Sequence, residues 1–458
     1  MNRKKRRFSV GFIALGCPKN VVDSERMLAE IANEGFVISS EPDNSDIIVI
    51  NTCGFIAPAE KESFKAIREA VNSKKNKKKR VRKVVVAGCL PERLRNDSLN
   101  KFKGIDAIVG LNQRNNIGKI IRDLLSTDKP KAYFDPIEGR YGESVLDDRA
   151  RLLITPSHWA YLRISEGCNH RCSFCTIPAI RGQFRSKTPE LVIAEAQELV
   201  SAGVRELNII AQDTTSYGKD LKMENGLTVL ISELEKITSL KWIRLMYLYP
   251  TGIDKKLVET IASSEKIVHY LDIPIQHISN DILKSMRRPD TKEQIVRLIE
   301  QLRSAMPDIV LRTTLIVGFP GETDRQFAEL MDMIKWAKFD ALGCFRFYPE
   351  AGTAAAQMSE QLPDKIKLQR LDELMRCQQE IAFNKNNSRI GSELTCLVDS
   401  LGHDNAATGR YYGQAPDIDS ICYIKSHYGK CSNRIEPGDF IRTKVTATKD
   451  YDLILEQI

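Results

Sequence analysis

Residues 161–178, with the sequence YLRISEGCNHRCSFCTIP, place three cysteines on one short loop directly after an apolar stretch. Cys168, Cys172 and Cys175 have the spacing C-x-x-x-C-x-x-C. Three thiolates at this spacing can hold three irons of a 4Fe–4S cube and leave the fourth iron open. S-adenosylmethionine (SAM) can bind such an iron, and its one-electron reduction supplies a radical able to remove hydrogen from an unactivated carbon. The alternative is a zinc loop in which His170 is the fourth ligand.

The surroundings of this loop predict the fold of the central part of the chain. Six apolar stretches alternate with helical patterns, which favours a partial (β/α)6 barrel over a full eight-stranded one. The cysteine loop follows the first of these strands, at the face of the barrel where such folds keep their active sites. The expected strands are Tyr161–Ile164, Glu206–Ala211, Trp242–Leu248, Val268–Ile273, Val310–Ile316 and Ala341–Phe347, with a long helix, Pro363–Asn386, after them.

A second set of cysteines lies in the first 125 residues, which alternate strand and helix patterns and predict an open α/β sheet. Cys17, Cys53 and Cys89 follow one another at intervals of 36 residues. Each comes directly after an expected strand, and these strands have the sequences VGFIALG, DIIVINT and KVVVAG. The C-terminal ends of parallel strands meet at one sheet edge, so we expect the three thiols to converge there. They predict a second cluster with an open iron. The alternative is three buried core cysteines.

The remaining five cysteines are expected to be free buried thiols. They are Cys344, Cys377, Cys396, Cys422 and Cys431.

The last 70 residues predict a third kind of structure, a small β-barrel of the oligonucleotide-binding type. Residues 387–458 hold 8 basic and 10 acidic side chains. A barrel that binds RNA phosphates should be basic, so we expect this one to dock a basic protein through Asp417, Asp419 and Glu436. The expected strands are Leu394–Val398, Thr408–Gly413, Ile421–Ile424, Phe440–Ala447 and Leu453–Glu456.

Composition sets the outer limits. The chain has 458 residues, 42% hydrophobic and 28% charged, which is typical of a globular protein with several domains. Apolar runs fall short of the ~20 residues of a membrane helix, which excludes an integral membrane protein. The net charge of +8 rests on two basic runs, residues 3–7 and 74–83, which could contact nucleic acid. Eleven cysteines without a secretion signal indicate a reducing compartment, the cytoplasm.

These features together resemble the radical-SAM methylthiotransferases over nearly the whole chain. That family joins an N-terminal cluster domain, a radical-SAM partial barrel and a C-terminal TRAM β-barrel, here expected at 8–125, 154–386 and 387–458 with a linker at 126–153. The segments Leu15–Asn20 and Ser165–Pro178 look like the ribosomal-protein branch, the RimO type. Asn51–Ile56 and Gly88–Leu90 also fit the family pattern.

The resemblance implies a reaction. The branch adds a methylthio group to the β-carbon of an aspartate in small-subunit ribosomal protein twelve, using two SAM molecules, a sulfur donor and a one-electron reductant. It also implies two 4Fe–4S clusters. Cys168, Cys172 and Cys175 would be the catalytic, radical-generating set, and Cys17, Cys53 and Cys89 the auxiliary set. The basic run at 74–83 would contact ribosomal RNA. The alternatives are a tRNA adenosine methylthiotransferase of the MiaB type and a non-catalytic, zinc-holding RNA-binding protein.

Other positions are weaker candidates for the pocket around SAM. Each also has an ordinary structural explanation, as a core residue, a turn residue or a surface arginine. The SAM candidates are Phe174, Arg181, Gln212, Asp213 and Gly318, and Arg185 and His277 are further pocket candidates.

Overall fold

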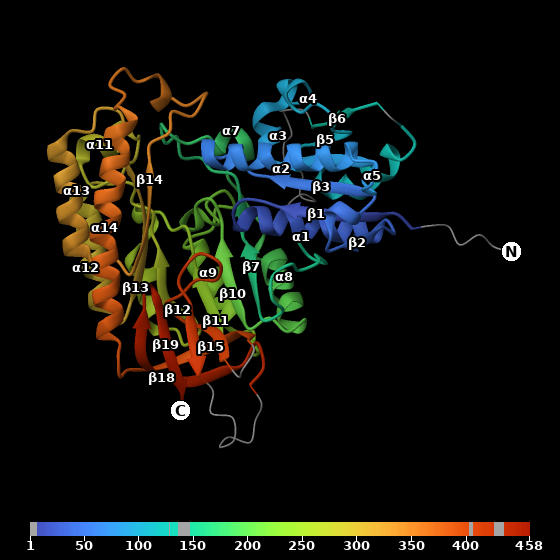
Figure 1. Ribbon diagram of the computed structural model, residues 1–458. Helices are drawn as coiled ribbons and strands as arrows, with labels where there is room; N and C mark the ends of the chain where they lie inside the picture. Colours follow the sequence, from blue (N-terminus) through green and yellow to red (C-terminus); the bar gives the residue numbers. More distant parts are fainter. Residues whose placement is uncertain (1–6, 128, 136–146, 403–405, 426–434) are drawn as a thin grey trace. The chain divides into compact units, whose positions relative to one another are not determined.

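A computed structural model describes residues 7–127, 129–135, 147–402, 406–425 and 435–458. The chain divides into two compact units (Figure 1). The first comprises 1–154, 165–170 and 175–198, and the second 155–164, 171–174 and 199–458. Cys431 and the basic residues 3–6 lie outside the described residues.

The first unit is built on a six-stranded sheet in which every pairing is parallel, in the order β2-β1-β3-β4-β5-β6. Its last strand, β6, lies in the stretch expected to be a linker and pairs with β5, so the sheet continues past residue 125. The strands are β1 Ser9–Ala14, β2 Val37–Ser39, β3 Ile47–Thr52, β4 Lys83–Gly88, β5 Ala107–Val109 and β6 Lys131–Tyr133. The helices are α1 Pro18–Asn33, α2 Ala57–Lys75, α3 Cys89–Leu94, α4 Ser98–Lys101 and α5 Ile117–Leu124.

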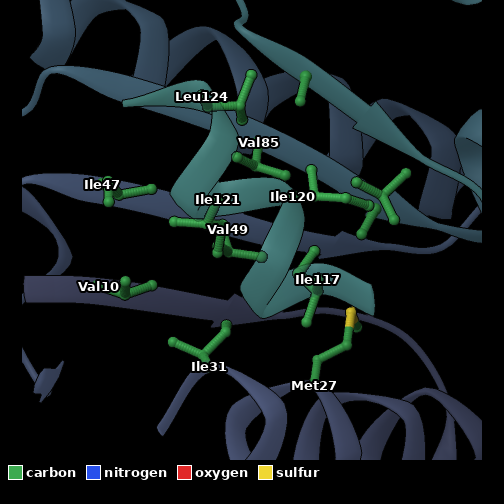
Figure 2. Close-up of a cluster of buried hydrophobic side chains, with 13 residues drawn as sticks. Val10, Met27, Ile31, Ile47, Val49, Val85, Ile117, Ile120, Ile121 and Leu124 are labelled. Atoms are coloured by element: carbon green, nitrogen blue, oxygen red, sulfur yellow. The ribbon is translucent and has the colours of Figure 1, made fainter. Parts of the chain in front are cut away.

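Apolar strands with two buried faces explain this sheet. Every residue of β3 and β4 is buried, as expected for parallel strands covered by helices on both sides. Successive side chains point to opposite faces, so Val49 and Val85 pack with α1 and α5, while Ile48 and Val86 pack with α2. Figure 2 shows the first of these two cores. The predicted open α/β sheet is confirmed.

The second unit contains six parallel strands in chain order, β14-β13-β12-β11-β10-β7. This is the predicted partial barrel, and observed strand ends differ from the expected ones by a few residues. The strands are β7 Trp159–Arg163, β10 Glu206–Ile210, β11 Trp242–Leu245, β12 Ile267–Asp272, β13 Val310–Val317 and β14 Ala341–Arg346. The helices are α9 Gly226–Glu235, α10 Lys255–Ser263, α11 Asn280–Ser285, α12 Lys292–Ala305, α13 Asp324–Ala337 and α14 Asp364–Ser388, and α8 Pro189–Ser201 begins in the first unit and ends in this one.

The same unit ends in a closed five-stranded barrel, β15-β16-β17-β19-β18, which confirms the third predicted module. Buried charges join it to the sheet of the partial barrel. Glu206 accepts from Arg244 at 3.0 Å and pairs with Arg410 of β16 at 2.7 Å. Arg410 also pairs with Asp399 at 2.8 Å. The strands are β15 Glu393–Leu401, β16 Ala406–Tyr411, β17 Cys422–Lys425, β18 Phe440–Lys449 and β19 Asp452–Gln457.

One expectation for this module is wrong. Asp419 does not face outward to meet a basic protein, because its side chain is 7% exposed and pairs with Arg312 of β13 at 3.4 Å. Tyr270 of β12 donates a further hydrogen bond to it at 2.7 Å. Its charge is thus used inside the unit, and only Asp417 and Glu436 of the expected acidic set are exposed.

Candidate cluster sites

The three N-terminal cysteines lie where three parallel strands of the first unit end. Cys17 caps the N-terminus of α1 after β1, Cys53 follows β3 directly, and Cys89 follows β4 and begins α3. The turns that carry them are in close contact, since a methyl group on Gly16 would lie 3.0 Å from Cys53 Cβ. The structure therefore brings the first set of predicted ligands to one sheet edge.

Asn20, on the first turn of α1, ties these turns together. Its Nδ2 donates to the carbonyl of Leu15 at 2.9 Å and to that of Thr52 at 3.0 Å. Its Oδ1 accepts from the thiol of Cys89 at 3.5 Å and lies 3.9 Å from that of Cys17. Because one side chain reaches two strand ends and two thiols, Asn20 fixes how these cysteines face one another.

Gly88 allows the turn at Cys89. Its backbone has φ 99° and ψ −151°, a region open essentially to glycine alone. A methyl group there would meet Asn51 Oδ1 at 2.3 Å and the carbonyl oxygen of Thr52 at 2.6 Å. The β4 strand can therefore turn into α3 and present Cys89 only with glycine at this position.

The environments of these thiols differ. Cys17 is exposed, whereas Cys53 is 7% and Cys89 5% exposed. Burial raises the pKa of Cys53, and it raises the pKa of Cys89 to about 12, with Arg181 acting against the shift. The free thiols of Cys53 and Cys89 therefore hold their protons at neutral pH, and a metal must displace those protons to bind.

The central loop places Cys168 and Cys175 in the first unit as well. Cys168 follows β8 (Ser165–Glu166), which pairs with β9 (Arg185–Ser186), and its N–H donates to the carbonyl of Gly182 at 3.2 Å. Cys175 Sγ accepts from the N–H of Ile177, the first residue of α7 (Ile177–Arg181), at 3.4 Å. The loop is thus held by its own backbone and by the start of a short helix.

Two contacts place this loop beside the N-terminal cysteines. Ile180 of α7 packs with Cys89 and Leu111 in one apolar cluster. Thr176, next to Cys175, donates to the carbonyl of Phe55, two residues after Cys53, at 3.3 Å. Residues that neighbour the two ligand sets along the chain are therefore in contact within one unit.

Cys172 belongs to the second unit. Burial raises the pKa of its thiol, which lies beside Arg288 and Tyr249. The guanidinium of Arg288 stacks on the Tyr249 ring, 4.0 Å from its centroid. The next residue, Ser173, anchors the backbone by donating to the carbonyl of Met286 at 3.0 Å.

Among the described residues, no three Cys, His, Asp or Glu side chains are close enough to hold a single metal ion.

Comparisons with known proteins agree with both units. Three family models match the chain, the uncharacterized protein family UPF0004 at 9–110, the radical SAM superfamily at 162–334 and the TRAM domain at 390–458. The ribosomal protein uS12 methylthiotransferase RimO of Acetivibrio thermocellus is 42% identical over 98% of both chains. RimO of Geobacter sulfurreducens is 41% identical, again over 98% of each. The chain belongs to the RimO family.

Membership in the RimO family makes the chain a transferase that depends on SAM and on iron–sulfur chemistry. A solved structure agrees with the fold alone. The radical S-adenosylmethionine methyltransferase TsrM of Kitasatospora setae superposes with a TM-score of 0.53 at 14% identity, covering 74% of this chain and 73% of that one. No helix among the described residues is both long and apolar enough to cross a membrane.

The SAM candidates outside the cysteines have ordinary contacts, and their role in this RimO-family chain stays a prediction. Phe174 is half-buried and packs against a core cluster that includes Met286 and Phe319. Asp213 is buried and accepts from the hydroxyls of Thr215 and Ser216, both at 2.5 Å, so it closes a local turn. Gln212, beside it, is half-buried.

Gly318 and His277 follow neighbouring strands of the second unit. The N–H of Gly318 donates to Glu322 at 2.7 Å, which closes the glycine-rich turn on itself. His277 is fully buried, and its Nδ1 accepts from the N–H of Ser279 at 3.0 Å. Its Nε2 lies 3.7 Å from Glu322. Arg185 lies in β9, opposite Glu166.

The basic run at 74–83 is less available to nucleic acid than its sequence indicates. Five of its eight cations pair with three aspartates of the first unit, Asp43, Asp46 and Asp106. Aspartates distant in sequence therefore pair with most of the run, and the local sequence pattern does not reveal this pairing. Lys74–Asp106 and Lys79–Asp43, both at 2.6 Å, are the shortest of these contacts.

Sequence reasoning missed three residues of the site. Asn20 and Glu166 were noticed only as parts of motifs, and Asp23 was not singled out. Asp23 lies one helical turn after Asn20 on α1, and Glu166 lies two residues before Cys168. The sequence did contain a signal for Asn20. It is a polar residue on the first turn of the helix that begins directly after Cys17.

Proposed function

We propose that the chain transfers a methylthio group to the β-carbon of an aspartate in ribosomal protein uS12. The observation that carries the proposal is the contact between the two cysteine loops in the first unit, where Arg181 of α7 reaches Cys89 Sγ at 3.2 Å. A reaction that joins sulfur to a carbon radical needs two cluster loops side by side. The relatives named as uS12 methylthiotransferases, matched over 98% of their length, support the substrate.

The two cysteine sets have different roles in this proposal. Cys168, Cys172 and Cys175 hold the cluster that binds SAM, and Cys17, Cys53 and Cys89 hold the auxiliary cluster. The donor sets fit, since each offers three thiols and no fourth cysteine nearby in sequence. The bound clusters supply an electron to SAM and a site for the transferred sulfur. The protein side chains orient the thiols and limit the access of water to Cys53 and Cys89.

The remaining partners follow from the reaction. Two SAM molecules supply the methyl group and the radical, a sulfur donor supplies the sulfur, and a one-electron reductant starts the cycle. The substrate places the enzyme in the cytoplasm, with the small ribosomal subunit or free uS12 as its partner. Lys75, Lys77 and Lys78 are the cations of the basic run left for ribosomal RNA.

A competition assay tests the proposal. The protein is reconstituted anaerobically with iron and sulfide, then mixed with SAM, reductant, and unmodified small subunits and tRNA in one tube. Mass spectrometry of both products should find the added methylthio group on a uS12 aspartate. The Cys168→Ala variant is the control and should label neither. Label on tRNA adenosine would keep the chemistry and overturn the substrate, and colourless protein that binds zinc in place of iron would overturn both.

A further inference from the structure

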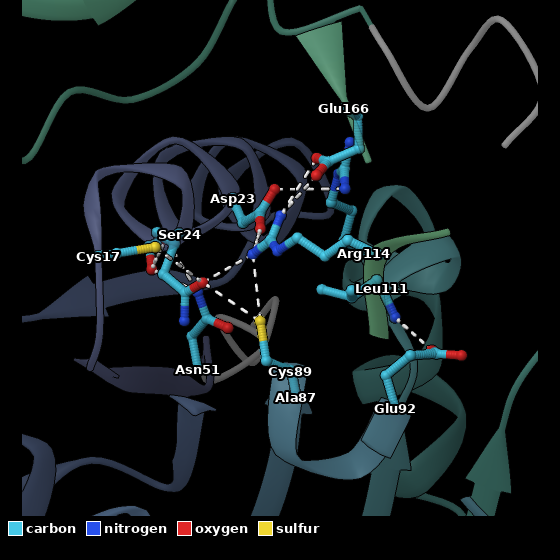
Figure 3. Close-up of polar contacts among 12 residues, drawn as sticks. Cys17, Asp23, Ser24, Asn51, Ala87, Cys89, Glu92, Leu111, Arg114 and Glu166 are labelled. Atoms are coloured by element: carbon cyan, nitrogen blue, oxygen red, sulfur yellow. Dashed lines mark hydrogen bonds and ion pairs between the residues drawn. The ribbon is translucent and has the colours of Figure 1, made fainter. Parts of the chain in front are cut away.

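Arg181, the last residue of α7, carries a buried charge that contacts Glu166, Asp23 and Cys89, which are labelled in Figure 3. Its side chain is 2% exposed. Nη1 donates to both carboxylate oxygens of Glu166 at 3.1 Å. Nη2 lies 2.9 Å from the carboxylate of Asp23, and 3.2 Å from Cys89 Sγ. One guanidinium therefore joins the strand before Cys168 to a cysteine of the other set.

The contacts fix the direction of this side chain. Nη2 also donates to Asn20 Oδ1 at 2.7 Å, the same oxygen that accepts from Cys89. A guanidinium is planar and its donors are rigidly spaced, so bonds to Glu166 on one side and Asn20 on the other leave it one orientation. Cys89 Sγ lies 3.2 Å from Nη2, within hydrogen-bond distance of this oriented donor.

The charged groups around Cys89 also indicate that Arg181 acts on its sulfur. Glu166 and Asp23 both pair with Arg181, and all three side chains are buried. Arg114 pairs with the other oxygen of Asp23 at 3.2 Å, so two cations face two carboxylates. A thiolate on Cys89 would be the additional anion, and Arg181 is the cation in contact with it.

The same geometry argues against the expected contact of Arg181 with SAM. A guanidinium that is 2% exposed and already bonded to Glu166, Asp23 and Asn20 has no open side for a ligand carboxylate. Its chemistry is directed at the sulfur of Cys89.

We propose that Arg181 is the positioning residue of the auxiliary site. It donates a charge-assisted hydrogen bond to the Cys89 sulfur, and its bonds to Glu166 link that sulfur to the Cys168 loop. The inference rests on the proposed function only in taking Cys89 to be a cluster ligand. Hydrogen bonds to cluster sulfurs and nearby net charge set the reduction potential of such a centre. Arg181 therefore makes the auxiliary cluster easier to reduce.

The test isolates the auxiliary cluster in the full-length chain. Cys168, Cys172 and Cys175 are all replaced by Ala, and the protein is reconstituted with iron and sulfide. In this background Arg181→Gln removes the charge, and Arg181→Lys keeps the charge but not the planar fork. Arg114→Gln is the matched control, because it removes an equally buried cation from the same Asp23. Redox titration followed by electron paramagnetic resonance gives the midpoint potential of each.

The potential should become more negative in Arg181→Gln, less so in Arg181→Lys, and least in Arg114→Gln. An equal shift in Arg181→Gln and Arg114→Gln, or an unchanged potential in a fully loaded Arg181→Gln protein, would overturn the inference. If Arg181→Gln does not fold, Arg181→Lys decides by the same criterion. The measurement needs no substrate, so a failure of uS12 labelling in the competition assay would leave its result intact.

Discussion

The two cysteine sets are held in opposite ways. Cys168, Cys172 and Cys175 span eight residues, and local contacts shape their loop, such as the bond from Ile177 N–H to Cys175 Sγ. Cys17, Cys53 and Cys89 span 73 residues and meet only because three parallel strands end together. Their geometry depends on tertiary contacts from Asn20 and Arg181. Ligands that are distant in sequence converge only through a buried polar scaffold, whereas the chain itself brings ligands on one loop together, and distant contacts such as that of Ser173 with Met286 anchor the loop.

Removal of each set in turn gives the largest expected effect. Alanine at Cys168, Cys172 and Cys175 should abolish SAM cleavage, because the cluster that delivers the electron has lost its ligands. Alanine at Cys17, Cys53 and Cys89 should leave 5′-deoxyadenosine formation intact and abolish methylthio transfer. Chromatography of deoxyadenosine and mass spectrometry of uS12 separate the two results. Methylthio transfer by the second variant would show that the N-terminal set is not a ligand set.

A methyl group at Gly88 should damage the scaffold of the N-terminal set specifically. Gly88→Ala places Cβ 2.6 Å from the carbonyl oxygen of Thr52, in a backbone region that alanine avoids, and should destabilise the unit by about 3 kcal/mol. Gly35→Ala is the control, because Gly35 has φ +84° but no atom within 4 Å of the added methyl, so its cost should be about 1 kcal/mol. Hydrogen exchange of β3 and β4 peptides measures both. Equal exchange in the two variants would mean that crowding at Gly88 is irrelevant.

Loss of the Asn20 side chain tests the scaffold by a smaller change. Asn20→Ala leaves the buried carbonyls of Leu15 and Thr52 without this donor, at a cost of about 1–3 kcal/mol. Iron bound by the N-terminal set should fall, while the central set should load normally. Asn44→Ala, which loses only an exposed bond to Glu41, should load both sets. Normal loading in Asn20→Ala would assign the convergence to the backbone alone.

The sequence was sufficient for the parts of the fold that follow from periodicity. Apolar runs predicted the three modules, and the equal spacing of Cys17, Cys53 and Cys89 predicted their convergence. The contacts of Asp419 with Tyr270 and Arg312 could not be predicted, because the pattern near residue 419 does not reveal a partner on a strand more than 100 residues away. The contacts of Arg181 with Asp23 and Cys89 could not be predicted for the same reason.

The smallest expected effect concerns His277, a pocket candidate of the second unit. The second unit buries the neutral imidazole of His277, whereas the first unit buries the guanidinium of Arg181. Burial lowers the pKa of His277 to about 3, well below the ordinary histidine value of 6.5, so between those two values the unfolded chain binds a proton that the folded one excludes. Stability must therefore fall as the pH drops below 6.5, and the step from pH 7 to pH 5 should cost about 2 kcal/mol. His277→Gln should lose this part of the pH dependence. All three tryptophans, Trp159, Trp242 and Trp336, lie in the second unit, so their fluorescence during urea unfolding at pH 7 and pH 5 reports on that unit directly. An identical pH dependence in the parent and the variant would mean that His277 takes up its proton in the folded state, which would require it to open toward solvent or toward Glu322.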